Sequence, residues 1–316
     1  MIESDRMKDN FVNLHVHSDA SVGDSVIKIP NLVDLVQEYN QEYIALTDHS
    51  STANWYALQQ ACKNKDIKAI FGNEFYCKTT MAKPANRTRY HLICLAQNEK
   101  GAQNIRAMQN IAVKHKYYKP LLPHQVLKNH SEGVFVTTAC ALGYVSQMLY
   151  NNHVDKAYDF LNFLLDTFGK DNVAIELQYH PDFKDDNDNY IQNIVNERLI
   201  KLYEDTDTKW IINTFDSHCL LDKDRNLRRR LQWKNWKKPY EEISETLRSN
   251  ILGNTELTYQ FAHESGVEDD KLIQKGIDNT YKIAEQCYFD MPENDRIIPV
   301  FNKHREFKKI FLKKVV

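Results

Sequence analysis

Between residue 11 and about residue 218, short apolar runs alternate with segments whose apolar residues recur at helical spacing. One such segment, NLVDLVQEYN, places Leu32, Val33, Leu35 and Val36 on one face of a helix. Regular alternation of strands and helices predicts an α/β fold whose parallel strands are joined by crossover helices. The runs with the length and composition of strands are FVNLHV, EYIALT, KAIFGNEFY, HLICLA, GVFVTTA, VAIELQ and KWIINTF.

The pattern changes after residue 222. The stretch DKDRNLRRRLQWKNWKKP is basic and aromatic, and acidic segments of helical pattern such as DDKLIQKGIDNTYKIAEQC follow it. We therefore divide the chain into an α/β domain over 10–222 and a helical extension over 223–316, with a linker toward another unit as the alternative. The chain closes on the Lys-rich FNKHREFKKIFLKKVV.

Composition excludes some classes of protein. The chain has 316 residues, 42% hydrophobic and 27% charged, with a formal net charge of −2, which is ordinary for a globular protein and gives no overall basic character. No apolar run is long enough to span a membrane, and the N-terminus has no signal peptide. Six cysteines without a CxxC pair favour reduced thiols in the cytoplasm over three disulfides.

Nine side chains of the types that bind zinc, manganese or iron are spread over two hundred positions. Two pairs are spaced two apart, so that on an extended strand both members project from one face. Four of the nine follow predicted strands, where a parallel barrel gathers its active site. His91 opens its strand instead, which this arrangement does not explain. The nine are His15, His17, Asp24, His49, Glu74, His91, Cys140, Asp216 and His218.

These residues and the stretches around them resemble the polymerase and histidinol phosphatase (PHP) superfamily. The stretches RYHLICLAQNEKGAQNI, KYYKPLLPHQVLKNHSEGVFVTTACALGYVSQML, VAIELQYH and INTFDSHCLLDKD are most similar to PHP domains at the N-terminus of bacterial DNA polymerase III alpha subunits. The resemblance covers residues 10–222 well and 223–316 loosely, where NTYKIAEQC and IIPVF resemble the lead into a polymerase palm. The palm is absent, so we expect no polymerase activity from this chain alone.

The resemblance implies a distorted (β/α)7 barrel that binds two to three divalent metal ions. The implied ligands are His15, His17, Glu74 and Asp216 for the first metal, with Glu74 bridging to the second. Glu74, His91 and Cys140 would hold the second metal, and Asp24, His49 and His218 the third. Many polymerase PHP domains have lost several of these ligands. Since all nine positions here carry a residue able to bind metal, the sequence favours an active site.

A multi-metal cluster predicts a metal-dependent phosphodiesterase, and we interpret it as a 3′–5′ exonuclease of proofreading type acting on DNA, alone or beside a separate polymerase chain. One alternative is a non-catalytic, metal-stabilised scaffold for a polymerase. Another is a small-molecule phosphatase like the histidinol phosphatases. Such a cluster needs no side-chain nucleophile, so Ser18 and Ser21 are interpreted as turn residues.

Two basic features each have two interpretations, and a third has one. Arg87 and Arg89, just before His91, either contact the substrate phosphate or belong to a solvated turn. The stretch RNLRRRLQWKNWKKP, with Trp233 and Trp236, either binds single-stranded nucleic acid or is a solvated helix whose tryptophans pack on the barrel. The tail HREFKKIFLKK suggests a helix that docks on a polymerase palm. The remaining histidines are predicted to be surface or structural residues: His115, His124, His130, His153, His180 and His263.

Overall fold

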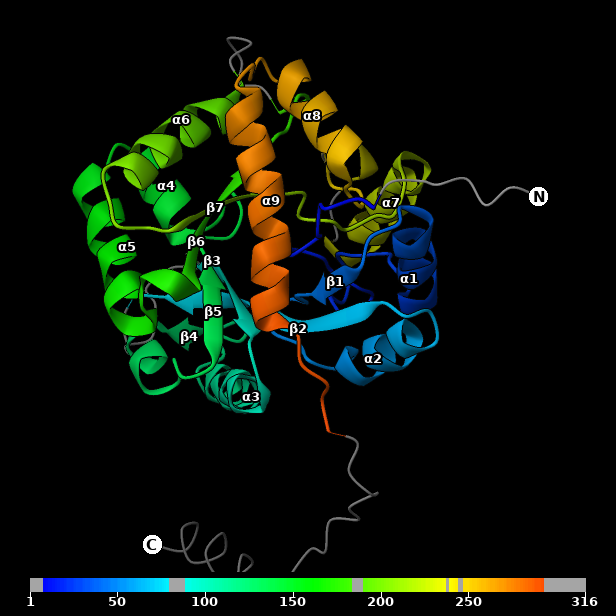
Figure 1. Cartoon of the computed structure of the whole chain (residues 1–316), viewed down its shortest axis with the longest axis horizontal. Helices are drawn as coiled ribbons and strands as arrows, with labels where there is room; N and C mark the ends of the chain where they lie inside the picture. Colours follow the sequence, from blue (N-terminus) through cyan, green and yellow to red (C-terminus); the bar gives the residue numbers. More distant parts are fainter. Residues whose placement is uncertain (1–7, 80–88, 184–189, 237–238, 244–246, 293–316) are drawn as a thin grey trace, which may run out of the picture.

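The computed structural model describes residues 8–79, 89–183, 190–236, 239–243 and 247–292. Arg87 and the tail after residue 292 therefore lie outside the described residues. The strands form one curled sheet in the order β1-β2-β3-β5-β6-β7, with β4 paired to β2 (Figure 1). The predicted distorted α/β barrel is confirmed. The strands are β1 (Tyr43–Leu46), β2 (Lys68–Lys78), β3 (Tyr90–Ala96), β4 (Leu122–Pro123), β5 (Val134–Thr137), β6 (Val173–Gln178) and β7 (Trp210–Thr214).

One strand runs against the predicted direction. β3 pairs antiparallel with both β2 and β5, whereas β1 with β2, β5 with β6 and β6 with β7 are parallel. The prediction of parallel strands throughout is therefore wrong for β3. Because β3 is reversed, its first residues lie at the sheet edge where the parallel strands end.

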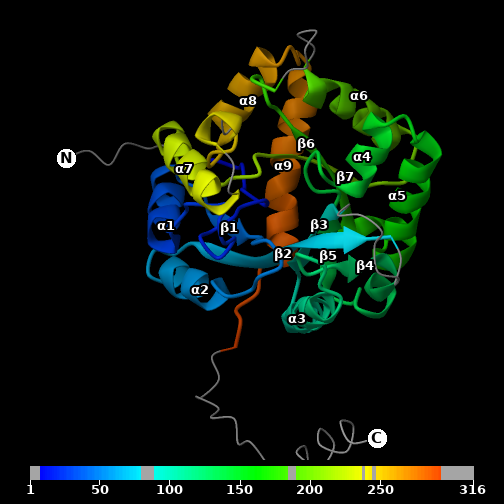
Figure 2. The same ribbon diagram turned by 180° about the vertical axis from the view of Figure 1, so that it is seen from behind.

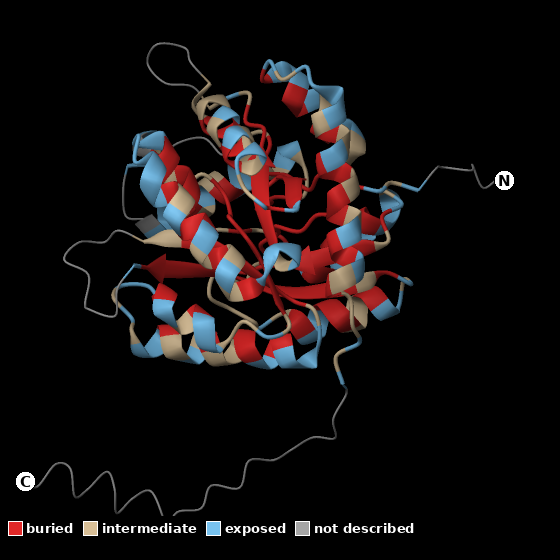
Figure 3. Cartoon of the chain, turned by 60° about the vertical axis from the view of Figure 1, so that its left-hand side comes forward, coloured by how far each residue is buried: buried red, intermediate tan, exposed pale blue. Residues whose placement is uncertain are grey.

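Helices surround the sheet (Figures 1 and 2). Their apolar stripes face the strands and their polar sides face outward, which gives the buried centre and mixed outer surface of Figure 3. In α1 the buried residues include the predicted Leu32, Val33, Leu35 and Val36. The helices are α1 (Ile29–Glu38), α2 (Trp55–Lys63), α3 (Glu99–Lys114), α4 (Tyr144–Tyr150), α5 (Val154–Phe168), α6 (Ile191–Glu204), α7 (Arg225–Trp236), α8 (Thr255–Glu264) and α9 (Asp270–Cys287).

The predicted strand FVNLHV is an extended segment that joins the two ends of the sheet. On one side the Ala45 amide donates to the Asn13 carbonyl at 3.1 Å. On the other, the His17 amide donates to the Ser217 carbonyl at 2.9 Å, and the Ser217 amide donates to the His15 carbonyl at 3.0 Å. These bonds connect β1 to the turn after β7, so the segment closes the barrel at the end where His15 and His17 lie.

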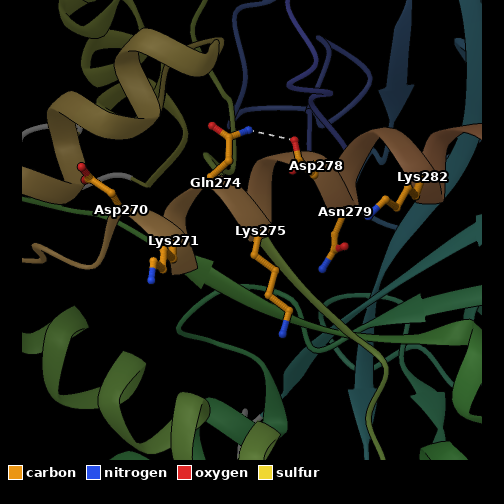
Figure 4. A pocket seen from close by; sticks show the side chains of 7 residues that line it. All are labelled: Asp270, Lys271, Gln274, Lys275, Asp278, Asn279 and Lys282. Carbon is orange, nitrogen blue, oxygen red and sulfur yellow. Dashed lines mark hydrogen bonds between the residues drawn. The ribbon is translucent and has the colours of Figure 1, made fainter.

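At the other end of the closing segment, α9 packs between β7 and that segment. Asn279 donates to the Ile211 carbonyl at 2.9 Å, and Asn213 donates to the Ile273 carbonyl at 2.8 Å. The amide of Val12 donates to the Thr280 hydroxyl at 2.9 Å. The last helix is thus bonded into the barrel wall. Its outer side is polar, with Lys271, Lys275 and Lys282 and a Gln274–Asp278 hydrogen bond (Figure 4).

The inside of the barrel changes from apolar to polar along the strands. Alternate residues of a strand share one face. At the apolar end the inward positions include Ile70, Phe135, Ala174 and Ile212, which pack in one cluster with residues of α9. The positions of the same parity further along carry polar side chains, all of them buried: Glu74, Thr137, Glu176 and Thr214. The polar end of the barrel is therefore where the chemistry is concentrated.

Candidate metal centre

All nine predicted ligands come together at the polar end of the barrel. His15 and His17 lie on the closing segment, Glu74 is in β2, and Asp216 and His218 follow β7. His91 joins them because β3 is antiparallel. The first residues of β3 therefore lie beside the ends of the parallel strands. The position of His91 that the parallel barrel left unexplained is thereby accounted for.

Glu74 lies at the centre of the group. Its Oε1 is 2.8 Å from Nδ1 of His91 and 3.4 Å from Nε2 of His15. Its Oε2 is 2.7 Å from Nδ1 of His49 and 3.3 Å from Nε2 of His17. The carboxylate is fully buried, and its two oxygens face different histidines. A carboxylate in this position has the geometry to bridge two cations.

Asp216 faces the first pair of histidines. Its Oδ1 lies 3.0 Å from Nε2 of His15 and 3.2 Å from Nε2 of His17. The Asp216 backbone has a φ of 49°, in the left-handed region that residues other than glycine rarely adopt. Strained backbone of this kind is typical of functional sites, where the surrounding structure fixes it.

A third group lies toward the open side of the site. Oδ2 of Asp24 is 3.2 Å from Nε2 of His49 and 3.4 Å from Nε2 of His218. His49 thus faces Asp24 with one ring nitrogen and Glu74 with the other. It links the inner and outer parts of the centre.

Cys140 lies beside His91, with its Sγ 3.5 Å from Nδ1 of His91 and 4.0 Å from Oε1 of Glu74. Burial, together with the charges of Asp216 and Glu74, raises the pKa of this thiol well above its usual value. A cation bound here would have to displace the thiol proton. All six cysteines are buried free thiols, as predicted.

Three of the histidines are fixed through one ring nitrogen and leave the other for the site. Nδ1 of His15 is 3.0 Å from the Glu176 carboxylate, Nδ1 of His17 is 3.1 Å from the Ser21 hydroxyl, and Nδ1 of His218 is 2.8 Å from the Asp216 carbonyl. Each contact suits an Nδ1–H donor, which leaves Nε2 with a lone pair. This is how proteins orient histidines that bind metals.

Six buried polar atoms of the centre have no hydrogen-bond partner, although they lie close to one another. Unpartnered buried polar atoms are rare in folded proteins, and each needs an explanation. Here they belong to histidines and carboxylates that converge, and three overlapping groups of them are compact enough to hold a cation. The donor set therefore fits divalent metal ions. The atoms are Nε2 of His15, Nε2 of His17, Nδ1 of His49, Oε2 of Glu74, Oδ1 of Asp216 and Nε2 of His218.

The charges are balanced internally. Burial alone would raise the pKa of Glu74, but His91, His49 and His15 outweigh it and hold that pKa well below its ordinary value. Conversely, burial alone would lower the pKa of His15, but Asp216, Glu176 and Glu74 raise it well above its ordinary value. Protons on the imidazoles thus compensate the buried acids, and a bound cation would take over that role.

Several residues that hold the ligands were not found from sequence. Glu176 bonds to His15 and also accepts from the Thr214 hydroxyl at 2.7 Å. Asp48 accepts from the Ser21 hydroxyl at 2.7 Å, so Ser21 is a link to His17 rather than only a turn residue. The signal for Glu176 was present, since it is the one acidic residue in the mostly apolar strand VAIELQ.

The centre opens into a cleft of about 780 Å³ whose lining includes Asp24, His49 and His91. The lining also includes Arg228, Gln232 and Asn235 of α7, together with Tyr76, Arg89 and Lys119. Trp233 is 47% exposed, and its ring meets the ring of Tyr240 edge-on, with centroids 5.9 Å apart. The side chain of Trp236 lies outside the described residues.

Three of the remaining histidines have the structural or surface positions that were predicted. His180 is buried and bonds to Ser249 and Gln178, and His124 is buried among aromatic rings. His263 is exposed and pairs with Asp270 at 2.8 Å. Within the described ranges, no helix combines the length and apolar character needed to cross a membrane.

Comparison with known proteins identifies the family. The PHP domain matches residues 13–180, slightly more than half of the chain. The chain belongs to the PHP domain family. DNA polymerase III subunit alpha of Aquifex aeolicus is 31% identical over 249 residues, which are 75% of this chain and 21% of that protein. The subunit of Borreliella burgdorferi is 34% identical over 200 residues, 61% of this chain and 17% of that protein.

This PHP chain thus spans about a fifth of the length of the polymerase subunits that it matches. Among solved structures, a protein described as a metal-dependent phosphoesterase from Bifidobacterium adolescentis aligns with a TM-score of 0.44 and 13% identity, over 80% of this chain and 96% of that one. The family match begins within the closing segment and ends after β6, so β7, α7 and α9 lie outside it. The domain boundary at residue 222 stays a prediction.

Proposed function

We propose that this PHP domain is a metal-dependent phosphodiesterase and that its substrate is the 3′ end of a DNA strand, which it shortens as a 3′–5′ exonuclease. The observation that carries the proposal is the convergence of six unpartnered buried nitrogen and oxygen atoms around Glu74, next to an open cleft that His49 lines. A purely structural metal site is closed, whereas a catalytic site keeps a position open to substrate.

We assign the ligands as follows. His15, His17, Glu74 and Asp216 would hold one metal, and Glu74, His91 and Cys140 a second. Asp24, His49 and His218 would hold a third. The proximity of His49 to Glu74, at 2.7 Å, also makes it a candidate for the second position. The mixture of imidazole, carboxylate and thiolate suits zinc, manganese or iron.

When bound, divalent ions in such a cluster supply phosphoester chemistry by lowering the pKa of a water molecule toward about 7 and by neutralising charge on the phosphate oxygens. The protein contributes the rest. Glu176 and Ser21 hold His15 and His17 in one tautomer, so their Nε2 atoms are aimed before any ligand arrives. Arg228 holds Asp24 at the rim of the cleft. Burial of Glu74 excludes bulk water from the inner side of the site.

DNA is proposed as the substrate because the relatives are DNA polymerase III alpha subunits. A separate polymerase chain is the matching partner. The cleft also has two cations in its lining, Arg89 and Lys119, which suit a polyanionic strand. These cations supply locally what the net charge of −2 does not supply overall.

The test is degradation of single-stranded DNA labelled at its 5′ end by protein loaded with Mn²⁺ or Zn²⁺. We expect a metal-dependent ladder that shortens from the 3′ end, and the same strand labelled at its 3′ end should release the label first. His17→Asn should abolish the ladder. The matched control is His263→Asn, because His263 is an exposed histidine of α8 far along the chain from the ligands.

The other outcomes identify the alternatives. Intact DNA with tightly bound metal would indicate a scaffold for a polymerase. Release of phosphate from a small monoester, with DNA left intact, would indicate a phosphatase. Either result would overturn the exonuclease.

A further inference from the structure

Two cationic side chains lie near the ring of Tyr76, a residue near the end of β2, beside the metal centre. Its ring stacks on His49, with centroids 5.0 Å apart and planes at 20°. The guanidinium of Arg89 lies 5.3 Å from the ring centroid of Tyr76, and the ammonium of Lys119 lies 5.5 Å from the same centroid. Both cations are thus one aromatic ring away from a proposed metal ligand.

The backbone brings these two cations together from distant parts of the chain. Arg89 precedes β3, whose antiparallel course places its first residues at the site. Lys119 lies in a tight turn where its amide donates to the Tyr117 carbonyl at 2.8 Å, with Tyr118 in the left-handed region at a φ of 61°. The placement of Lys119 therefore depends on a fixed turn and not only on a long side chain.

The charges of Arg89 and Lys119 are not neutralised in the way that the charge of Arg228 is. Arg228 lies 2.8 Å from the carboxylate of Asp24. Across the part of the chain that the structure describes, no carboxylate forms an ion pair with Arg89 or Lys119, although both line the cleft with His49 and His91. Two like charges held near one ring repel each other, and an anion between them relieves that repulsion.

We propose that Arg89 and Lys119, supported by Tyr76, form a subsite for a second phosphate of a nucleic acid strand, next to the phosphate at the metal centre. This proposal rests on the proposed phosphodiesterase function. A guanidinium suits phosphate because it can donate two parallel hydrogen bonds, and an ammonium adds a compact charge. A small monoester has one phosphate and would leave the subsite empty. The subsite therefore favours a strand over a small molecule.

Binding is measured first, without catalysis. Fluorescence anisotropy of a labelled oligodeoxythymidylate, in EDTA, gives the binding constant at a series of salt concentrations. For single strands, each phosphate contact contributes about 0.7 to the slope of log K against log salt. Arg89→Met with Lys119→Met should make the slope shallower by about 1.4 and weaken binding several-fold at low salt. Arg89→Lys with Lys119→Arg should restore most of the slope.

The matched control removes the same charge elsewhere. Lys156→Met with Lys201→Met changes two exposed lysines of α5 and α6, which do not line the cleft. This control should keep the wild-type slope. An unchanged slope in the Arg89 and Lys119 variant, or an equal change in the control, would overturn the subsite.

A second measurement separates this proposal from the proposed function. With metal, kcat/KM is compared for the oligonucleotide and for bis(p-nitrophenyl) phosphate, a diester with a single phosphate. In the Arg89 and Lys119 variant, kcat/KM for the oligonucleotide divided by kcat/KM for bis(p-nitrophenyl) phosphate should be at least fivefold lower than in the wild type. An equal loss on both substrates would mean that these residues support the metal centre, and the subsite would be wrong. If the wild type cleaves neither substrate, the phosphodiesterase fails, while the salt slope still decides the subsite.

Discussion

The guanidinium of Arg228 holds the carboxylate of Asp24 from the α7 side, with Nη2 2.8 Å from Oδ1 and Nε donating to the Asp24 main-chain oxygen at 2.8 Å. Gln232, one turn further along α7, donates to the same Oδ1 at 3.0 Å. The other oxygen, Oδ2, is left facing His49 and His218. A helix outside the family match thus orients one proposed ligand.

Replacing Arg228 should therefore weaken one metal site. We expect Arg228→Met to lower the affinity of the site to which Asp24 belongs by about 10- to 100-fold, the usual cost of losing a group that orients a ligand. Removing the cation also removes its repulsion of the metal, but this gain is smaller because Asp24 borders the open cleft and water screens the charges. Calorimetric titration of the metal-free protein with Zn²⁺ or Mn²⁺ measures the affinity.

Arg230→Met is the control for this change, because Arg230 lies exposed on the same helix. It should bind metal as the wild type does. Tighter binding in Arg228→Met would show that charge repulsion outweighs orientation. The positioning role of Arg228 would then be wrong.

Glu176 has the same role for His15 on the inner side of the site. Glu176→Gln keeps the shape of the side chain but removes the charge that accepts from Nδ1 of His15. We expect the affinity of the inner metal site to fall by about 10- to 100-fold, measured by the same titration. Glu197→Gln, an exposed change on α6, should have no effect. Wild-type affinity in Glu176→Gln would rule out a role for this carboxylate in holding His15.

The nine candidate residues could be predicted because local patterns mark them. His49 and Asp216 come just after strand-like runs, Glu74 follows the apolar KAIFG, and the C-terminal ends of parallel strands meet at one edge. The direction of β3 was missed, although the sequence contains a signal. The link between β2 and β3 is TTMAKPANRTR, which has no apolar helical pattern and so cannot supply the crossover that parallel strands need.

The partners of the ligands were harder to predict because they depend on long-range packing. α7 carries several arginines in a row, and only the orientation of the helix decides that Arg228 reaches Asp24. The position of α9 is decided in the same way. Its amphipathic pattern predicts a helix, but its place in the barrel wall depends on bonds between Asn213, Asn279 and main-chain carbonyls far away in sequence.

His124 should make the stability of the protein depend on pH below neutrality. Burial lowers the pKa of His124 to about 4, from an ordinary value of 6.5. Between these two values the unfolded chain binds a proton that the folded protein excludes, so stability falls as the pH drops from 6.5 toward 4. The full effect is at most about 3 kcal/mol.

The variant that isolates this effect is His124→Phe, because His124 already packs against the rings of Phe160 and Tyr144. Urea unfolding of both proteins across this pH range gives the two stabilities. The metal-site histidines titrate equally in both proteins and cancel in the difference. The wild type should lose stability faster than the variant as the pH falls. Parallel curves would mean that His124 accepts its proton in the folded state.

Gly276 tests whether α9 is an integral part of the barrel. In an exposed helix, replacing glycine by alanine stabilises by about 1 kcal/mol. Here an added Cβ would lie 2.5 Å from Nδ2 of Asn213. Asn213 cannot easily move, because it donates to the Ile273 carbonyl at 2.8 Å and accepts from the Tyr179 hydroxyl at 3.2 Å. Overpacking of this kind costs about 1–3 kcal/mol, so we expect Gly276→Ala to be destabilising overall.

Chemical denaturation measures the change in the free energy of unfolding caused by Gly276→Ala. The sign of that change decides whether α9 is tightly packed against β7. A second variant, Asn213→Ala, removes the group that the new methyl would meet. Adding Gly276→Ala to Asn213→Ala should therefore cost less than adding it to the wild type, which a double-mutant cycle quantifies. If Gly276→Ala instead stabilises the protein, the helix does not press against β7. The chain after residue 222 would then be an extension attached to the barrel and not a part of its wall.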